Sequence, residues 1–318
     1  MTDLASAFER SVDEGNMRLH RSLPVLLATG AVGGIDVGLG VFSLLLVRSD
    51  THSVIAGALA FSAGFIALTL AHSELFTENF LVPIAALVAR KATVGDLARL
   101  WLGTLSTNLL GGWVFMGIVM LGFPSLHATA RSLASHYMDA GINLHSFATA
   151  VIGGTVITVM TWMERGSAST GGKIVAAIVA AFLLAVGSLN HVIVMSLVIF
   201  AGLAAHAPFG YLTWAEVAGW ATLGNLVGGL GLVTVLRLVQ VGGEKLKQER
   251  DRPDGTRRDP DTVALRIRQK AAGDDASATS GTGREGFSPG AGGERSLPEI
   301  EIQAVRGEDD QPAGSGAS

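Results

Sequence analysis

Long apolar runs separated by short polar segments occupy the chain from residue 23 to residue 241. These runs cover residues 23–47, 54–89, 97–123, 147–163, 174–205 and 217–239. A helix needs about 20 apolar residues to cross the hydrocarbon core of a bilayer. The pattern therefore predicts an all-α integral membrane protein with six transmembrane helices, numbered here as spans one to six.

Spans two and five are too long for one simple crossing, and each contains a polar interruption. Residues 72–79 (HSELFTEN) form the first break, in span two, and residues 189–191 (LNH) form the second break, in span five. Backbone inside a membrane leaves helical geometry only where protein or a water-filled cavity satisfies its hydrogen bonds. We therefore expect helices two and five to be broken.

Landmarks recur at one spacing in the two halves of the chain. The string Asn-Leu-x-Gly-Gly begins at Asn108 and at Asn225, and this offset of 117 also relates Glu74 to His191. The spacing indicates two repeats of three spans each. Since three is odd, the second repeat enters the membrane inverted, and inverted repeats place a transport pathway at their interface near the bilayer midplane.

Composition and charge support a membrane body. Of the 318 residues, 49% are hydrophobic and 16% are charged, whereas soluble domains have about 25% charged residues. Lysine and arginine gather before span one, after spans two and four, and after span six, while the opposite loops hold only Arg48 and Arg131. By the positive-inside rule we expect a multi-pass protein of the cell inner (plasma) membrane with both termini in the cytoplasm.

The segment before span one, residues 1–22, has two interpretations. Leu4, Phe8, Val12 and Leu19 lie on or near one face of a helix, which favours an amphipathic helix on the cytoplasmic membrane surface. The alternative is a frayed polar terminus.

The composition changes after the transport domain, which we place at residues 23–241. Residues 242–318 are rich in Gly, Ser, Asp, Glu and Arg and poor in large apolar residues. This composition predicts a disordered cytoplasmic tail. Its basic stretch at 245–258 either contacts anionic lipid or is a solvated linker.

His191 is the leading functional candidate, because an ionisable residue inside a membrane bundle is a functional hypothesis by default. It lies away from both ends of span five, next to Asn190. The alternative is a neutral histidine that only hydrogen-bonds a neighbouring helix. Asn108 and Asn225 also lie within apolar spans, where an unpartnered amide is costly. We expect both amides to hydrogen-bond the irregular backbone of a break, with substrate contact as the alternative.

The first break carries both polar and apolar candidates. Glu74 is expected to brace the loop by accepting hydrogen bonds from exposed N–H groups. Thr77 offers a hydroxyl that donates and accepts, and Leu75 and Phe76 beside it suit a narrow dry constriction. Phe65 lies upstream on the same span. It either lines the pathway or is an ordinary packed core residue, and the two interpretations have equal weight.

These residues resemble the formate/nitrite transporter family. The Ser-Glu-Leu-Phe-Thr string at 73–77 looks like its Glu-Leu-Phe-Thr signature. The Gly-Lys-Ile at 172–174, the central histidine, and the Gly-Asn-Leu-Val-Gly-Gly at 224–229 are similar too. The resemblance covers about residues 20–240. It implies an aquaporin-like six-helix protomer, a homopentamer with one pathway in each protomer, and passage of small monovalent anions such as formate, nitrite, hydrosulfide, acetate or lactate.

The resemblance also implies roles by position. Thr77 matches the threonine of the loop that interrupts helix two, His191 the central histidine, and Lys173 a basic residue at the cytoplasmic entrance.

The apolar positions of the family are matched as well. Leu75 and Phe76 match the outer constriction, and Phe65 and Leu184 fall where the family has its inner constriction.

Five positions depart from the family pattern. Asn190 replaces the usual Glu before the histidine, Met195 replaces an Asn, and Glu78 replaces a small residue after the threonine. Asp36 and His72 add ionisable groups. Glu78 and Asp36 either pair with His72 or His191 in a charged network, or they make the path prefer cations or protons.

The expected function is proton-linked transport of a small anion or weak acid, with His191 as the proton relay, the bilayer as environment, and no nucleic-acid partner. A channel for a neutral solute or cation is the alternative, and a non-transporting scaffold is weaker. An enzyme is not expected, since neither Gly-x-Ser-x-Gly nor His-Glu-x-x-His occurs. No cofactor or metal is expected, and a metal site among His127, His136, His145 and His206 is a minor alternative.

Overall fold

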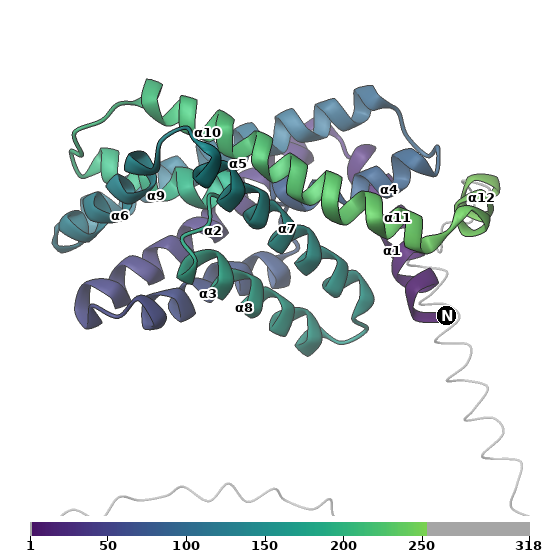
Figure 1. Ribbon diagram of the computed structural model, residues 1–318, viewed down its shortest axis with the longest axis horizontal. Helices are drawn as coiled ribbons and strands as arrows, with labels where there is room; N and C mark the ends of the chain where they lie inside the picture. The colour runs from purple at the N-terminus through teal and green to yellow at the C-terminus, as the bar shows by residue number, and fades with distance from the viewer. Residues whose placement is uncertain (1, 253–318) are drawn as a thin grey trace, which may run out of the picture. The chain divides into compact units, whose positions relative to one another are not determined.

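The computed structural model describes residues 2–252, and these residues are helical with short connections and contain no strand (Figure 1). The helices are α1 (Thr2–Leu19), α2 (Leu23–Thr51), α3 (Val54–Ala71), η1 (Phe76–Phe80), α4 (Val82–Val88), α5 (Val94–Gly122), η2 (Pro124–Leu126), α6 (His127–Ala140), α7 (Leu144–Gly166), α8 (Thr170–Val186), α9 (Val192–Ala204), α10 (Tyr211–Leu226), η3 (Val227–Thr234), α11 (Val235–Val241) and α12 (Gly243–Asp251).

The helices follow the apolar runs. Five helices in the described part of the chain are long and apolar enough to cross a membrane: α2, α3, α5, α7 and the continuous stretch Tyr211–Val241. Span two continues beyond α3 through η1 and the short helix α4, and span five is divided between the shorter apolar helices α8 and α9. Both expected breaks are therefore present.

The segment before span one is a helix, but its apolar face packs on protein. Ala7, Phe8 and Val12 of α1 form one buried cluster with residues of α4 and with Trp162 of α7, and α1 lies along α4. Gly15 lies directly against the backbone of Val82. The expectation of a membrane-surface helix is corrected, because α4 offers this face a protein partner.

A second short helix, α6, was not expected from the sequence. It lies between spans three and four and packs along α9, with Ala130, Leu133, Ala134 and Tyr137 buried. Its position against α9 parallels that of α1 against α4. In each case a helix that precedes a three-span set covers the second half of a broken span.

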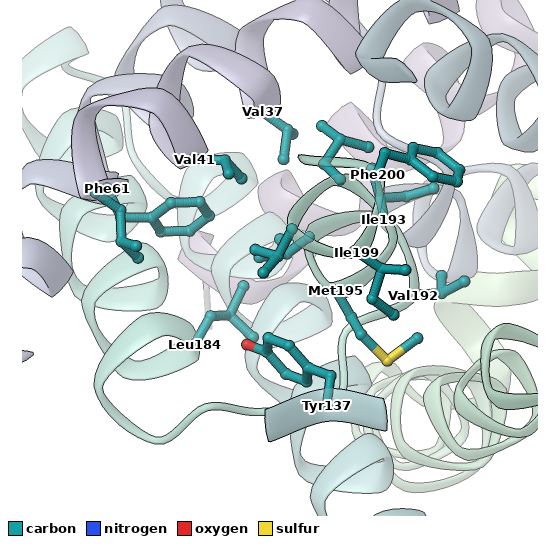
Figure 2. Close-up of a cluster of buried hydrophobic side chains, with 14 of the residues drawn as sticks. Val37, Val41, Phe61, Tyr137, Leu184, Val192, Ile193, Met195, Ile199 and Phe200 are labelled. Atoms are coloured by element: carbon teal, nitrogen blue, oxygen red, sulfur yellow. The ribbon is translucent and has the colours of Figure 1, made fainter. Parts of the chain in front are cut away.

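The core of the described protein surrounds α9, in which every residue from Val192 to Gly202 is buried. Figure 2 shows its side chains together with those of α2, α3, α6 and α8, including Val37, Phe61, Tyr137 and Leu184. A helix that is apolar on all sides is typical of a buried core position. The second break, at the start of α9, is therefore enclosed by protein.

The expectation that residues 242–318 are disordered is wrong for their first part. Residues Gly243–Asp251 form α12, and Lys245 contacts Glu9 of α1 at 2.5 Å. The Arg252 guanidinium pairs with Asp13, and the Arg250 Nε donates to the Val88 carbonyl. Acidic residues of α1 thus give this basic segment partners. The rest of the expected tail, residues 253–318, lies outside the described residues.

Two glycines at matching places in the two halves allow close backbone approaches between spans. A Cβ on Gly34 would collide with the carbonyl oxygen of Asn108, and a Cβ on Gly154 would collide with that of Asn225. Spans one and three therefore touch backbone to backbone, as do spans four and six. Small residues serve this purpose between membrane helices.

We expect Gly34→Ala and Gly154→Ala each to destabilise the protein, because over-packing a close contact costs about 1–3 kcal/mol. The measurement is the apparent melting temperature of the purified protein in detergent. Gly117→Ala is the matched control, since nothing lies within 4 Å of a Cβ there. Equal melting temperatures for all three variants would contradict this packing.

Candidate functional site

Asn108 of α5 hydrogen-bonds the backbone of the first break. The α3 helix ends at His72, which has a left-handed conformation with φ of 55°, and the chain then passes into η1. The Phe76 N–H donates to the Asn108 Oδ1 at 2.8 Å. The Asn108 Nδ2 donates to the carbonyls of Gly30 at 2.7 Å and Glu74 at 2.8 Å. One buried amide thus binds backbone groups on both sides of the break.

Asn225 of α10 does the same at the second break. The Val192 N–H donates to its Oδ1 at 2.9 Å. Its Nδ2 donates to the carbonyls of Ala150 at 2.7 Å and Asn190 at 3.0 Å. The spacing of 117 predicts that Glu74 corresponds to His191, but these hydrogen bonds make Asn190 the equivalent of Glu74 and Val192 the equivalent of Phe76. The correspondence therefore shifts by one residue at the breaks.

Thr77 and His191 meet between the two breaks. The Thr77 Oγ1 and the His191 Nε2 are 2.6 Å apart, and both residues are fully buried. The His191 Nδ1 lies 3.4 Å from the Val194 N–H, which caps the start of α9. Because a neutral imidazole has one N–H, this cap places the ring hydrogen on Nε2, facing Thr77. The Thr77 hydroxyl then keeps its own hydrogen for another acceptor.

The four apolar candidates are core residues. Leu75, Phe76, Phe65 and Leu184 are all buried and belong to one apolar cluster. Phe76 makes an edge contact with Phe80, and Phe65 packs against Phe61. The four residues that the family resemblance assigns to constrictions are thus close-packed side chains of the central core.

Glu78 and Glu74 face α1 rather than a histidine. The fully buried Arg18 lies 3.5 Å from the Glu78 carboxylate and 3.5 Å from that of Glu74, and it donates to the Asn79 Oδ1 at 3.0 Å. Arg21 pairs with Glu74 at 2.5 Å. The expected pairing of Glu78 with His72 or His191 is wrong, as is the expected bracing of backbone N–H groups by the Glu74 carboxylate. Arginines of the N-terminal segment provide stronger partners.

Two opposed effects act on the pKa of Arg18. Burial lowers it, but the carboxylates of Glu74, Glu14 and Glu78 raise it more, so it lies above its usual range and the guanidinium stays charged. One oxygen on Glu74 and one on Glu78 are buried without a hydrogen-bond partner in residues 2–252. Arg18 is therefore the cation that both of these buried carboxylates share.

Asp36 and His72 lie at the edge of the first break. Asp36 accepts a hydrogen bond from the Ser73 hydroxyl, so the expectation that it pairs with His72 or His191 is also wrong. His72 is exposed on the surface of the protomer. Ser73, which is buried and follows His72 directly, is the hydrogen-bond donor to the half-buried Asp36 carboxylate.

Lys173 and Asn190 are separated by the length of α8. Lys173 is half-buried on the first turn of α8, about 20 Å along the helix from its end at a rise of 1.5 Å per residue. Asn190 is buried beside His191, and its amide donates to the Ser146 carbonyl at 3.0 Å. Only Asn190 therefore lies at the Thr77–His191 pair.

A cavity of about 530 Å³ opens beside the second break. Its lining includes His136 and His145, from α6 and α7, and Ser188 and Asn190, from the connection between α8 and α9. It brings solvent-accessible space to the residue that precedes His191. Within the described residues, no group of three or more acidic or histidine side chains could hold a metal ion.

The positive-inside rule explains Arg18 and Arg21 only as charges that set the topology. A signal was available: Ser11, Gly15 and Arg18 lie on the same stripe of α1 as Phe8 and Val12. A charged residue within the apolar stripe of a helix needs a buried counter-charge. The positions assigned roles by the family resemblance lie within the spans and not in the segment that precedes them.

Comparison with a family model settles the relationship. The model described as formate/nitrite transporter matches residues 5–239, which is most of the chain. The chain belongs to the formate/nitrite transporter family. This is a family of membrane transporters and channels and not of enzymes. The function class of the chain is therefore membrane transport, and at the level of the family the transported solutes are anions.

Individual relatives are distant. The inner membrane protein YfdC of Escherichia coli (strain K12) is 26% identical over 245 residues, covering 72% of this chain and 76% of the relative. The formate channel BtFdhC of Bacillus thuringiensis is 25% identical over 248 residues, covering 71% of this chain and 90% of the relative. A solved pentameric formate channel with formate bound has a TM-score of 0.58 and 21% identity, covering 69% of this chain and 97% of the other. That likeness shows a shared fold.

We expect Asn108→Leu and Asn225→Leu each to lower stability by about 3 kcal/mol or more. Each substitution leaves one N–H and two carbonyls without their partner, at about 1–3 kcal/mol for each buried group. The readout is the apparent melting temperature in detergent. Ser106→Ala is the control on α5, since that exposed hydroxyl bonds only its own helix. A melting temperature within one degree of wild type for either Leu variant would argue against the bracing role.

The pH dependence of α1 docking follows from Glu14. Burial raises the pKa of its carboxyl, but Arg18, Arg165 and Arg21 lower it more, so the net pKa lies below the usual value. A depressed pKa stabilises the folded state fully above the unfolded value, about 4.3, and this contribution disappears as the pH falls through the folded value. We expect Glu14→Gln to lower the melting temperature by a constant amount from pH 8 to about 5.5, and the difference to close below about pH 4.

The control for that measurement is Asp50→Asn, which removes an exposed carboxylate at the far end of α2. It should show no comparable difference at any pH. A Glu14→Gln difference that grows as the pH falls would reverse the sign of the argument.

Proposed function

We propose that this chain carries a small monovalent anion of a weak acid, such as formate or nitrite, across the cell inner (plasma) membrane through a path in each protomer. The observation that carries the proposal is the 2.6 Å hydrogen bond between Thr77 and His191. It joins two broken spans within a chain of the formate/nitrite transporter family. The relative BtFdhC is a formate channel, which supports the same substrate class.

The architecture belongs to the proposal. We take residues 23–241 as six spans in two inverted three-span repeats of aquaporin-like form, and residues 1–22 and 242–318 as cytoplasmic. Support comes from the matched bonds of Asn108 and Asn225 and from the matched close contacts of Gly34 and Gly154. We extend each repeat by its preceding helix, α1 or α6, because both cover the second half of a broken span. A homopentamer is supported by the shared fold with a pentameric channel.

The path would pass through an apolar centre. Leu75 and Phe76 on one side and Phe65 and Leu184 on the other exclude water, and a bare anion there is very costly. The solute therefore crosses as its neutral acid, taking up a proton on one side and releasing it on the other. Net transport is then of an anion together with a proton.

Thr77 and His191 act at the centre of this path. The Thr77 hydroxyl hydrogen is free to be donated to the solute, because the His191 Nε2 hydrogen already points to Thr77. His191 sits at the N-terminus of α9, where backbone dipoles favour negative charge. We assign His191 as the proton donor or relay and Lys173 as a basic residue of the cytoplasmic entrance, with the cavity beside Asn190 as the outer approach.

We expect uptake of one anion into proteoliposomes to need both an inward proton gradient and His191. A panel of labelled formate, nitrite, acetate, lactate and bicarbonate would be measured with and without the gradient. His191→Phe should reduce the uptake at least tenfold, because it removes the hydrogen bond and the titratable ring. Thr77→Val should reduce it by a similar factor.

Ser196→Ala is the matched control on α9, the half of span five that follows His191. Its buried hydroxyl accepts a hydrogen bond from the Trp214 indole N–H of α10, and its loss should leave uptake near wild type. Unchanged uptake in His191→Phe would remove the proton relay. Silence of the wild type across the panel would favour the alternative function, a channel for a neutral solute or a cation, and would call for solute-swelling and cation-flux assays.

A further inference from the structure

The first break concentrates charge next to the central pair in a way that the second break does not. Glu74 and Glu78 flank Thr77 within the same short loop, and both carboxylates are nearly completely buried. At the second break the corresponding neighbour of His191 is the neutral Asn190, whose amide bonds a backbone carbonyl. The field at the centre is therefore governed by the first break.

Without counter-charges, these two carboxylates would repel an anion. Glu78 follows Thr77 directly in the chain, and its carboxylate is buried. Two unit charges inside a protein interact more strongly than in water, because the effective dielectric constant is lower. Uncompensated negative charges at Glu74 and Glu78 would therefore reduce the occupancy of an anion at Thr77.

The compensating charges come from the N-terminal segment. Arg18 pairs with both carboxylates and Arg21 pairs with Glu74, so two arginines face these two carboxylates. Glu164 and Arg165 of α7 act on Glu78 with opposite signs. Glu14, which also pairs with Arg18, has Arg165 as a second partner at 3.8 Å. No other cation forms an ion pair with Glu78 in the described part of the chain.

We propose that Arg18 is a specificity-determining residue, the counter-charge from α1 that makes the Thr77–His191 centre accessible to an anion. The N-terminal helix is then part of the transport pathway and not an accessory to it. This inference rests on the proposed function. A purely structural role for Arg18 makes different predictions, because bracing depends on its hydrogen bonds whereas compensation depends only on the sum of charges.

The test compares single and paired substitutions in proteoliposomes, with the anion that the wild type takes up. Arg18→Gln leaves Glu78 uncompensated, and we expect anion uptake to fall at least tenfold through a raised KM, with permeability shifting toward cations. Arg18→Gln combined with Glu78→Gln removes one charge of each sign. We expect this double variant to recover uptake to within about threefold of wild type, although it restores none of the lost hydrogen bonds.

Arg10→Gln is the matched control. Arg10 lies on the same helix and is exposed, and its Nε donates to the Arg165 carbonyl, so its loss should leave KM and selectivity unchanged. A double variant that is as impaired as Arg18→Gln, with unchanged ion selectivity in both, would overturn the proposal and leave Arg18 as a brace.

Failure to assemble is covered by a second variant. If Arg18→Gln does not elute as wild type in size-exclusion chromatography, Glu78→Gln alone decides. It leaves an excess of positive charge beside Thr77, and we expect a several-fold lower KM for the anion, whereas an unchanged or raised KM would overturn the proposal. If the wild type takes up no anion at all, the proposed function itself has failed. If the wild type transports an anion but the Arg18 variants have the same KM and selectivity as wild type, only the present proposal has failed.

Discussion

Irregular backbone in the middle of a membrane has to find its hydrogen bonds within the protein, and two asparagines meet that need here. Asn108 and Asn225 each accept from one N–H and donate to two carbonyls around a break. The glycine contacts allow the neighbouring spans to come close enough for these amides to reach. The contact between Thr77 and His191 depends on these amides, because the backbone at both breaks has to be kept out of helical geometry for the two side chains to meet.

The two breaks satisfy their backbones alike but differ in charge. The second is neutral, enclosed by the apolar helix α9 and approached by a cavity that ends at Asn190. The first contains two carboxylates whose partners lie outside the spans, on α1 and in the turn that follows it. Buried ion pairs are weak evidence for stability, since desolvation offsets much of the attraction. Their position next to Thr77 gives them a more direct consequence for what can occupy the centre.

Much of this could be predicted from the sequence, because the signals were local. Apolar run lengths indicate the spans, the polar strings at 72–79 and 189–191 indicate the breaks, and the recurring Asn-Leu-x-Gly-Gly string indicates the bracing amides. The partners of Glu74 and Glu78 were missed because they depend on contacts with residues more than 50 positions away. The helices α6 and α12 were missed for a related reason. Both are polar enough to resemble loop or tail, and each is held by tertiary partners such as α9 for α6 and the acids of α1 for α12.

The position of α1 also constrains the order in which the protein is completed. The residues of α1 are synthesised before their partners, since Arg18 pairs with Glu74 and Glu78, which follow span one and the first part of span two. The ion-pair partners of Glu9 and Asp13 are synthesised later still, because Lys245 and Arg252 follow the last span. A helix that precedes all six spans thus completes its contacts only after the last of them, and a nascent chain that stops before α12 lacks Lys245 and Arg252, which pair with it.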